Sequence, residues 1–183
     1  MGIITKRDVA EYMVSKKIIL VGDFSTGKTS LIRRFVDNQF SDTYMTTIGV
    51  KISRKSIALD NETVQGLIWD IEGGTDKKPV NTIYLKGANG CIVVADITRK
   101  ETIAHLESYI VTVEKISGAI PCILVLNKSD KISEEEKEKI FARVLEQYSD
   151  RTEAIFLSSA KSGEGVEEMF TATVRSIMDK GEH

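Results

Sequence analysis

The sequence predicts an α/β domain with a six-stranded, mostly parallel sheet, one antiparallel edge strand and helices on both faces. Four apolar runs, at residues 16–22, 90–96, 121–127 and 153–159, are continuous rather than alternating. Strands buried on both faces of a parallel sheet have this pattern. Segments with a helical period separate the runs, and such alternation is typical of doubly wound domains.

Three segments between these runs have the apolar spacing of helices that cover a sheet. A fourth helix is predicted after Ser133, which forms a capping-box pattern with Glu136 and precedes a charged face that we expect to be solvated. His105 lies on the flank of the second stripe and is expected to be structural. The stripes consist of Leu31, Ile32, Phe35 and Val36; of Ile103, Leu106, Ile110 and Val113; and of Val166, Met169, Phe170, Val174 and Ile177.

The stretch from Val50 to Ile71 leaves no room for a crossover helix. It predicts two strands joined around residues 60–62, which form an antiparallel hairpin at one edge of the sheet. No Gly/Ser-rich linker divides the chain, so residues 16–180 are expected to form one domain. Residues 1–15 are then an N-terminal extension that could form a short helix.

Composition and charge exclude several classes of function. The chain has 183 residues and a formal net charge of -2, so it has no broad attraction to nucleic acid or anionic lipid. No apolar run is long enough to span a membrane, and the N-terminus is too charged for a signal peptide. Cys91 and Cys122 lie in apolar runs and are expected to be buried thiols in a reducing compartment. These features favour the cytoplasm.

A glycine-rich loop follows the first predicted strand. Residues 22–30 read GDFSTGKTS and satisfy the pattern G-x-x-x-x-G-K-[ST]. The glycines let consecutive backbone N–H groups point at phosphate oxygens, and the following helix adds its N-terminus. The lysine brings a charge to the terminal phosphates, and the threonine hydroxyl can bind Mg²⁺. A nucleotide phosphate site is therefore predicted at Ser25, Thr26, Gly27, Lys28, Thr29 and Ser30.

Two short motifs at the ends of later strands indicate the base. Residues 127–130 read NKSD, and a carboxylate there can accept from both N1–H and the exocyclic amine of guanine. Adenine offers no matching pair of donors, so an ATP site is disfavoured. Residues 159–161, SAK, bring backbone amides that can hold a base carbonyl. Both motifs lie where ligands bind in open α/β sheets.

Together with TTIGV at 46–50, WDIEGG at 69–74, YLKGANGCIVVADIT at 84–98 and SSAKSGEGVEEMF at 158–170, these motifs resemble the Ras-like small GTPases. The Rab branch is the most similar. The resemblance covers roughly residues 16–180 and implies the P-loop small GTPase fold. It also implies a switch that binds GTP or GDP with Mg²⁺, whose two switch loops are released when the γ-phosphate is lost.

The resemblance implies roles by position. Thr47 is similar to the first-switch threonine that binds Mg²⁺ and the γ-phosphate, and Asp70 to the acid that holds Mg²⁺ through water, beside Thr29. Gly73 corresponds to the glycine whose amide contacts the γ-phosphate. Phe40 and Tyr44 resemble the aromatic residues on the guanine edge and over the phosphates. The guanine-recognition set implied by the resemblance is Asn127, Lys128, Asp130, Ser159, Ala160 and Lys161.

The sequence departs from the family at the second switch, where the usual Asp-x-Ala-Gly-Gln is replaced by residues 70–74, DIEGG. Gly74 stands where the family has the glutamine that orients the attacking water. Phe24 stands where the phosphate loop usually has a small residue, and its ring would crowd the water and an incoming arginine finger. We therefore expect slow intrinsic hydrolysis and impaired action of ordinary GTPase-activating proteins (GAPs).

Glu72 has three interpretations that the sequence leaves open. It could orient the attacking water in place of glutamine, which would make it a catalytic residue beside Lys28 and Thr47. It could instead repel the γ-phosphate and favour GDP. Alternatively, it is a solvent-facing or locally paired carboxylate, as acids on loops usually are.

Two classes of function fit these residues. The first is a small GTPase with slow hydrolysis, and the alternative is a guanine-nucleotide-binding scaffold that does not hydrolyse GTP. The resemblance implies a monomer whose switch loops bind an effector, with an exchange factor and a GAP as further partners and no nucleic acid. No covalent membrane anchor is expected, because SIMDKGEH at 176–183 has no cysteine and Lys6 departs from a myristoylation signal.

Overall fold

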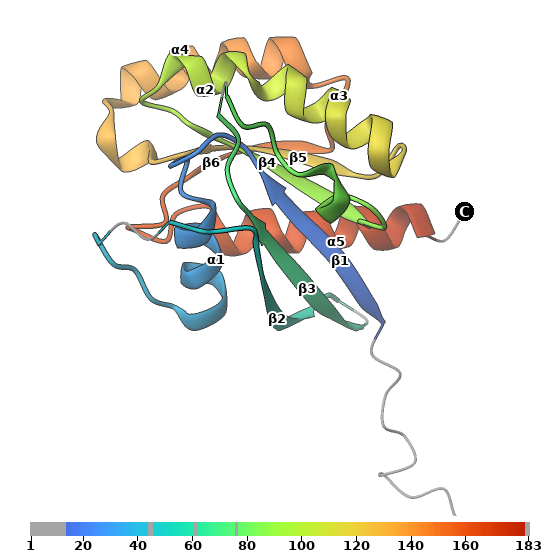
Figure 1. The fold of residues 1–183 in the computed structure, drawn as a ribbon. Helices are drawn as coiled ribbons and strands as arrows, with labels where there is room; N and C mark the ends of the chain where they lie inside the picture. The colour runs from blue at the N-terminus through green and yellow to red at the C-terminus, as the bar shows by residue number, and fades with distance from the viewer. Residues whose placement is uncertain (1–13, 44–45, 61, 76, 182–183) are drawn as a thin grey trace, which may run out of the picture.

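The computed structural model describes residues 14–43, 46–60, 62–75 and 77–181. Within them, six strands form one sheet in the order β2-β3-β1-β4-β5-β6 (Figure 1). Strand β2 runs antiparallel to β3, and the other neighbouring strands are parallel. The predicted fold class and edge hairpin are confirmed. The strands are β1 (Ser15–Val21), β2 (Val50–Ala58), β3 (Thr63–Ile71), β4 (Gly90–Asp96), β5 (Cys122–Asn127) and β6 (Ala154–Ser158).

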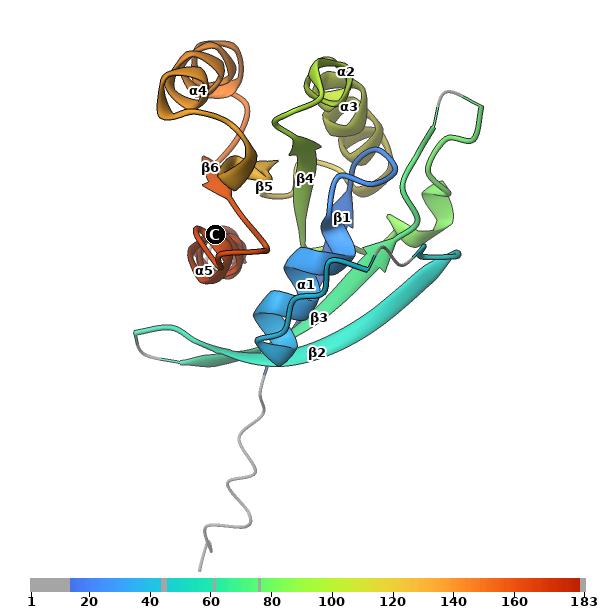
Figure 2. The ribbon, with the colours of Figure 1, turned by 90° about the vertical axis from the view of Figure 1, so that its left-hand side faces the viewer.

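Helices cover both faces of the sheet. Figure 2 shows α1 and α5 on one face and α2, α3 and α4 on the other, while the β2–β3 pair curves away at the edge. The predicted capping box at the start of α4 is present. The helices are α1 (Lys28–Asp37), α2 (Lys100–Ala104), α3 (Leu106–Ser117), α4 (Glu134–Tyr148) and α5 (Val166–Gly181), and two 3₁₀ turns are η1 (Thr82–Tyr84) and η2 (Ser129–Lys131).

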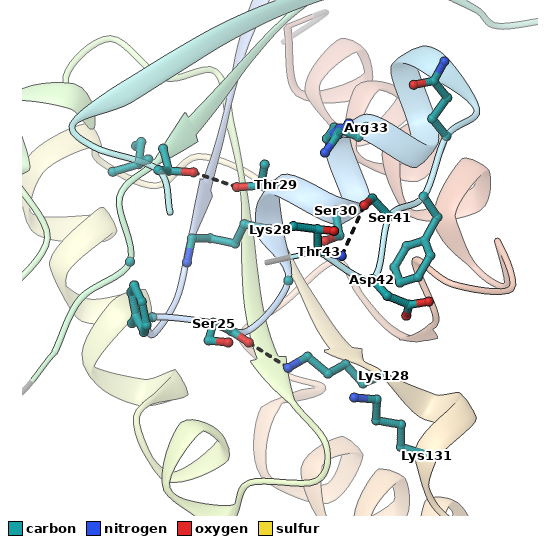
Figure 3. Close-up of a pocket in the computed structure, with 17 residues that line it drawn as sticks. Ser25, Lys28, Thr29, Ser30, Arg33, Ser41, Asp42, Thr43, Lys128 and Lys131 are labelled. Carbon is teal, nitrogen blue, oxygen red and sulfur yellow. Dashed lines mark hydrogen bonds between the residues drawn. The ribbon is translucent and has the colours of Figure 1, made fainter. Parts of the chain in front are cut away.

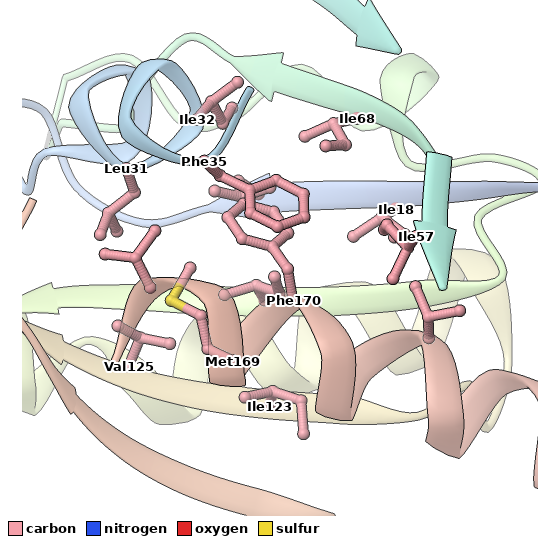
Figure 4. Close-up of a cluster of buried hydrophobic side chains, with 14 of the residues drawn as sticks. Ile18, Leu31, Ile32, Phe35, Ile57, Ile68, Ile123, Val125, Met169 and Phe170 are labelled. Carbon is pink, nitrogen blue, oxygen red and sulfur yellow. The ribbon is translucent and has the colours of Figure 1, made fainter. Parts of the chain in front are cut away.

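Each face has its own apolar core. Beneath α1 and α5, the rings of Phe35 and Phe170 stack with their centroids 4.0 Å apart (Figure 4). Both side chains are buried against residues of the central strands, such as Ile18 and Val125. Burying aromatic side chains of this size is a large part of what stabilises such a core. The packing fixes α1, and with it the loop that precedes α1.

The second predicted helical stripe is divided between two helices. Ile103 lies in α2, whereas Leu106, Ile110 and Val113 lie in α3, and His105 is the junction. The prediction of one continuous helix is wrong, because α2 ends at Ala104 and α3 begins at Leu106, with His105 (φ -82, ψ -8) between them. All four apolar side chains are nevertheless buried as predicted.

Cys91 and Cys122 are buried free thiols, as predicted. They are also register partners on β4 and β5, which the sequence spacing did not reveal. Burial raises the pKa of Cys91 well above its usual value, with a further contribution from Cys122. The thiol form is therefore strongly favoured at this position.

Candidate functional site

The loop between β1 and α1 folds tightly because two of its glycines admit no side chain. Gly22 has φ 145, and a Cβ on it would lie 2.2 Å from the carbonyl oxygen of Val94. Gly27 has φ 97, and a Cβ on it would lie 2.3 Å from Nδ2 of Asn127. Glycine is the residue that tolerates both the positive φ and the close approach. The loop is thereby pressed against the ends of β4 and β5.

The N-terminus of α1 is built to receive an anion. Helix α1 begins at Lys28, its first turn holds no acidic residue, and the described residues provide no side-chain cap. The first N–H groups of the helix are thus available to phosphate oxygens. The buried Lys28 Nζ donates to the carbonyls of Gly22 (3.0 Å) and Asp23 (2.9 Å). Burial lowers the pKa of Lys28 to about 8, against the opposing effect of nearby carboxylates.

Three oxygen-bearing side chains meet beside Lys28. The hydroxyl of Thr29 lies 2.7 Å from that of Thr47 and donates to Oδ2 of Asp70 at 2.7 Å. Thr47 also donates to Asp70 Oδ2, at 3.2 Å. Oδ1 of Asp70 is buried without a hydrogen-bond partner in the described part of the chain. Hydroxyl and carboxylate oxygens are ligands that Mg²⁺ prefers, so the residues present fit this cation.

Asn127 joins the phosphate loop to the loop after β6. Its Nδ2 donates to the carbonyl of Thr26 (2.9 Å), and its Oδ1 accepts from Ser158 Oγ (3.2 Å) and from the backbone N–H of Ala160 (3.3 Å). The side chain is 1% exposed. A buried amide whose donor and acceptor are both used holds its surroundings in one arrangement.

Two charged side chains complete this corner of the molecule. Lys128 Nζ donates to the carbonyl of Ser25 (2.8 Å) and to Oδ2 of the buried Asp96 (2.6 Å). Asp130 Oδ1 accepts a hydrogen bond from the hydroxyl of Ser159 (2.7 Å). Asp130 is exposed to solvent.

These elements surround a pocket with a volume of about 260 Å³ (Figure 3). Lysines enter it from two sides, since Lys28 is the first residue of α1, while Lys128 directly follows β5 and Lys131 ends η2. Most of the predicted guanine-recognition set does not line this pocket but lies in or beside the adjoining hydrogen-bonded corner. These residues are Asn127, Asp130, Ser159, Ala160 and Lys161. The predicted site residues that line the pocket are Ser25, Gly27, Lys28, Thr29, Ser30, Phe40, Thr47, Gly73 and Lys128.

The second switch contacts the first switch through Glu72. The Gly49 N–H donates to Oε2 of Glu72 (2.9 Å), while the Glu72 N–H donates to the carbonyl of Gly49 (2.8 Å). Lys78 Nζ donates to Oε1 of Glu72 at 2.7 Å. The hydrogen bonds that the carboxylate accepts lower the pKa of Glu72 below its usual value, and the bond from Lys78 has the largest effect. The carboxylate lines a separate, smaller pocket, an arrangement that favours the interpretation of a locally paired carboxylate.

Gly73 and Gly74 press closely on the phosphate loop. A Cβ on Gly73 would lie 2.6 Å from the Cα of Phe24. The Phe24 N–H donates to the carbonyl of Gly74 at 2.9 Å. The Phe24 side chain is one of the pocket-lining residues and is 40% exposed. The ring therefore stands at the pocket beside the second switch, where the sequence predicted crowding.

Comparison with known proteins decides the family. The sequence model of the Ras family matches residues 17–179. The chain belongs to the Ras family. "Ras-related protein Rab-1" of Theileria parva is 34% identical over 172 residues, which cover 93% of this chain and 77% of that protein. "Ras-related protein Rab-1C" of Dictyostelium discoideum is 32% identical over 168 residues (91% and 83%), and "GTP-binding protein ypt1" of Schizosaccharomyces pombe is 30% identical over 172 residues (93% and 83%).

The protein is thus a small GTPase of the Rab branch, a molecular switch with GTP-hydrolysing activity, as the sequence predicted. Nothing in the comparisons favours the non-hydrolysing scaffold. Among the described residues, no helix has both the length and the apolarity needed to cross a bilayer. Tyr44 and most of the N-terminal extension lie outside the described residues, so the predictions for them stay predictions.

Several residues of the site were not identified from the sequence. Arg34 on α1 donates to the carbonyls of Ala160 (2.9 Å) and Lys161 (2.7 Å) and so holds the loop after β6. No sequence motif links residues so far apart. Other unforeseen residues line the pocket, namely Arg33, Gln39, Ser41, Asp42, Thr43, Ile71 and Lys131.

Proposed function

We propose that this small GTPase is a slow switch, which binds GTP or GDP together with Mg²⁺ and resets by weak intrinsic hydrolysis. The observation that supports it best is the convergence of Lys28, Thr47, Gly73 and Lys128 on one pocket. These residues come from the phosphate loop, the two switches and the base-recognition motif. A ligand with a guanine at one end and a γ-phosphate at the other would contact all four regions.

The phosphates are proposed to lie along the loop before α1. Backbone N–H groups there would bind phosphate oxygens, while Lys28 places its charge at the terminal phosphates. We propose Thr29, Thr47 and Asp70 as the residues that hold Mg²⁺, directly or through water. Bound Mg²⁺ would neutralise charge on the β- and γ-phosphates. The proposed phosphate-binding set is Ser25, Thr26, Gly27, Lys28, Thr29 and Ser30, with Gly73 at the γ-phosphate.

The guanine is proposed to lie at the corner formed by η2 and the loop after β6. The carboxylate of Asp130 would accept from N1–H and the exocyclic amine, and Phe40 would pack on the base edge. Ser159 holds Asp130 in place through the 2.7 Å hydrogen bond. The remaining proposed members are Asn127, Lys128, Ala160 and Lys161.

Hydrolysis is proposed to be slow because residue 74 has no side chain to orient the attacking water. The carbonyl of Gly74 is occupied by the Phe24 N–H, and the paired carboxylate of Glu72 is directed to Gly49 and Lys78. None of these groups replaces the usual glutamine. Lys28 and Thr47 remain the proposed contributors to charge stabilisation in the transition state.

Partners are proposed from the exposed apolar side chains beside the first switch. Ile48 is 86% exposed and Ile52 on β2 is 48% exposed. Apolar side chains on a surface that changes with the nucleotide support an effector protein as the partner. We propose that an exchange factor and a GAP act on the same monomer. The buried free thiols of Cys91 and Cys122 support a reducing compartment, proposed to be the cytoplasm.

The test is single-turnover hydrolysis of GTP that has been loaded onto the protein with Mg²⁺. We expect a rate below about 10⁻⁴ s⁻¹, which is the scale of an intact Ras-type site without a GAP. Displacement of a fluorescent GDP by GTP but not by ATP should accompany it, and Lys28→Met serves as the control that loses phosphate binding. A rate at or above about 10⁻⁴ s⁻¹ would show that another group orients the water.

A further inference from the structure

Asp23, the second residue of the phosphate loop, is held by α3 and the junction that precedes it. Its Oδ1 accepts a hydrogen bond from the Tyr109 hydroxyl at 2.8 Å. Its Oδ2 accepts from Nδ1 of His105, also at 2.8 Å. Both carboxylate oxygens of Asp23 are thus used, and the side chain is only 15% exposed. His105 and Tyr109 therefore hold the Asp23 carboxylate from both sides.

The second switch pairs with the phosphate loop at Asp23. Gly74 forms a parallel β-bridge with Asp23. The Phe24 N–H donates to the Gly74 carbonyl (2.9 Å), and the Gly74 N–H donates to the Gly22 carbonyl (3.3 Å). Residue 74 is therefore attached through its backbone to the residues on both sides of Asp23.

Tyr109 occupies the space that a side chain at position 74 would need. A Cβ on Gly74 would lie 2.5 Å from the Tyr109 hydroxyl oxygen, a distance that real contacts do not reach. The next nearest atoms, of Val80 and of the Tyr109 ring, lie at 3.4 and 3.5 Å. The backbone of Gly74 is not in the left-handed region. A side chain at position 74 would therefore require the Tyr109 hydroxyl to shift, although the backbone conformation of residue 74 itself would accept one.

We propose that Tyr109 is a positioning residue of the second switch that keeps GTP hydrolysis slow. Its hydroxyl fixes Asp23 and reserves the space beside Gly74, so that the second switch pairs with the phosphate loop through backbone alone. We therefore expect a glutamine at position 74 to be displaced from a water-orienting position while the hydroxyl is present. This inference rests on the proposed slow hydrolysis and states which residue, distant in the sequence, maintains it.

The contact itself is tested by a double-mutant cycle of Gly74→Ala and Tyr109→Phe, read as the melting temperature of the GDP-bound protein. Phenylalanine keeps the ring and removes the hydroxyl, which leaves ordinary contact distances around an alanine Cβ. We expect Gly74→Ala to lower Tm by about 2–4 °C in the wild type, the shift that a loss of about 1 kcal/mol produces in a domain of this size. In the Tyr109→Phe background no loss is expected. Equal losses in both backgrounds would overturn the inference.

His105→Ala provides the matched control for the cycle. It removes the other hydrogen bond to Asp23 but leaves the Tyr109 hydroxyl beside residue 74. The loss caused by Gly74→Ala should therefore persist in this background. If His105→Ala abolished the loss as Tyr109→Phe does, the effect would come from a loosened Asp23 and the assignment to Tyr109 would be wrong.

The role in hydrolysis is tested by placing glutamine at position 74 with and without the hydroxyl. All variants also carry Phe24→Gly, which removes the ring from the pocket but keeps the N–H that bonds to residue 74. Gly74→Gln alone should not raise the single-turnover rate, whereas Gly74→Gln with Tyr109→Phe should raise it at least about tenfold, within the range usual for positioned catalytic groups. A glutamine that acts equally in both backgrounds, or in neither, would overturn the positioning role. If even the wild type releases no phosphate from bound GTP, the proposed hydrolysis fails, while the Tm cycle still decides the contact.

Discussion

The corner formed by η2 and the loop after β6, where we propose that the base binds, differs from the second switch in how its residues are held. At the corner, buried polar side chains bind one another and the backbone of distant loops, as Asn127 does with Thr26 and Ala160. At the second switch, Gly73 and Gly74 contribute only backbone groups. The side chain of Glu72 beside them is paired with the first switch and with an exposed lysine.

The difference shows where residue identity is imposed by the fold. Each buried polar atom at the corner must keep a partner, because an unsatisfied one costs about 1–3 kcal/mol. A substitution there disturbs several elements at once. The second switch has fewer such constraints, so a substitution there disturbs fewer partners. The predictions that follow test this contrast.

The largest effect is expected at the corner, from Asp130→Ala. Loss of two charge-assisted hydrogen bonds to guanine should weaken GDP binding roughly 10²–10⁴-fold, at about 1.5–3 kcal/mol for each bond. Competition with a fluorescent GDP measures this change. Lys131→Ala, which alters a neighbouring residue of the pocket lining, should keep the affinity within about tenfold. An Asp130→Ala protein whose GDP affinity stays within tenfold of wild type would contradict the proposed guanine site.

A smaller effect is expected where the corner joins β4. Burial acts to raise the pKa of Asp96, but hydrogen bonds from Lys128 and Thr98 outweigh it and leave the pKa below its usual value. Asp96→Asn should therefore lower the unfolding free energy by about 2–3 kcal/mol at pH 7. A carboxylate with a lowered folded-state pKa stabilises the protein above its unfolded pKa, near 3.9, and this contribution is lost as pH falls through the folded pKa.

Urea unfolding at a series of pH values measures this contribution. The difference between wild type and Asp96→Asn should be constant from pH 7 to about pH 5 and shrink below about pH 4. Glu101→Gln, which removes an exposed partner of Arg99, should change stability by less than about 0.5 kcal/mol. A difference that grows towards low pH would mean that Asp96 is not stabilised as its charged form.

The same contrast explains what the sequence could predict. The strands, the helical stripes and the edge hairpin follow from local periodicity and were found where expected, apart from the break at His105. The residues around Thr29, Thr47 and Asp70 were grouped by resemblance to the family. The contact between Gly74 and Tyr109 was not predictable, because it depends on how α3 packs behind the phosphate loop. The glycine at position 74 does not by itself reveal that the Tyr109 hydroxyl occupies the space beside it.

The smallest effect is expected from Glu72→Ala at the second switch. If Glu72 is a locally paired carboxylate, the hydrolysis rate and the ratio of GTP to GDP affinity should change less than about threefold, which is near 0.6 kcal/mol. Hydrogen exchange of the Gly49 amide should become several-fold faster, because the carboxylate that accepts its N–H is gone. Single-turnover hydrolysis, nucleotide competition and exchange measured by NMR give the three values.

The two other roles of Glu72 predict different outcomes. A water-orienting carboxylate would make Glu72→Ala hydrolyse GTP at least about tenfold more slowly, within the usual range for general-base groups. A carboxylate that repels the γ-phosphate would make the variant bind GTP more tightly relative to GDP.

Lys78→Met is the matched control, because it removes the charge partner and leaves the Glu72 carboxylate in place to accept from Gly49. If the amide exchange of Gly49 rises less in Lys78→Met than in Glu72→Ala, the Glu72 carboxylate itself connects the two switches. The second switch would then depend on paired surface groups and backbone, in contrast to the buried side-chain network around Asn127 at the corner.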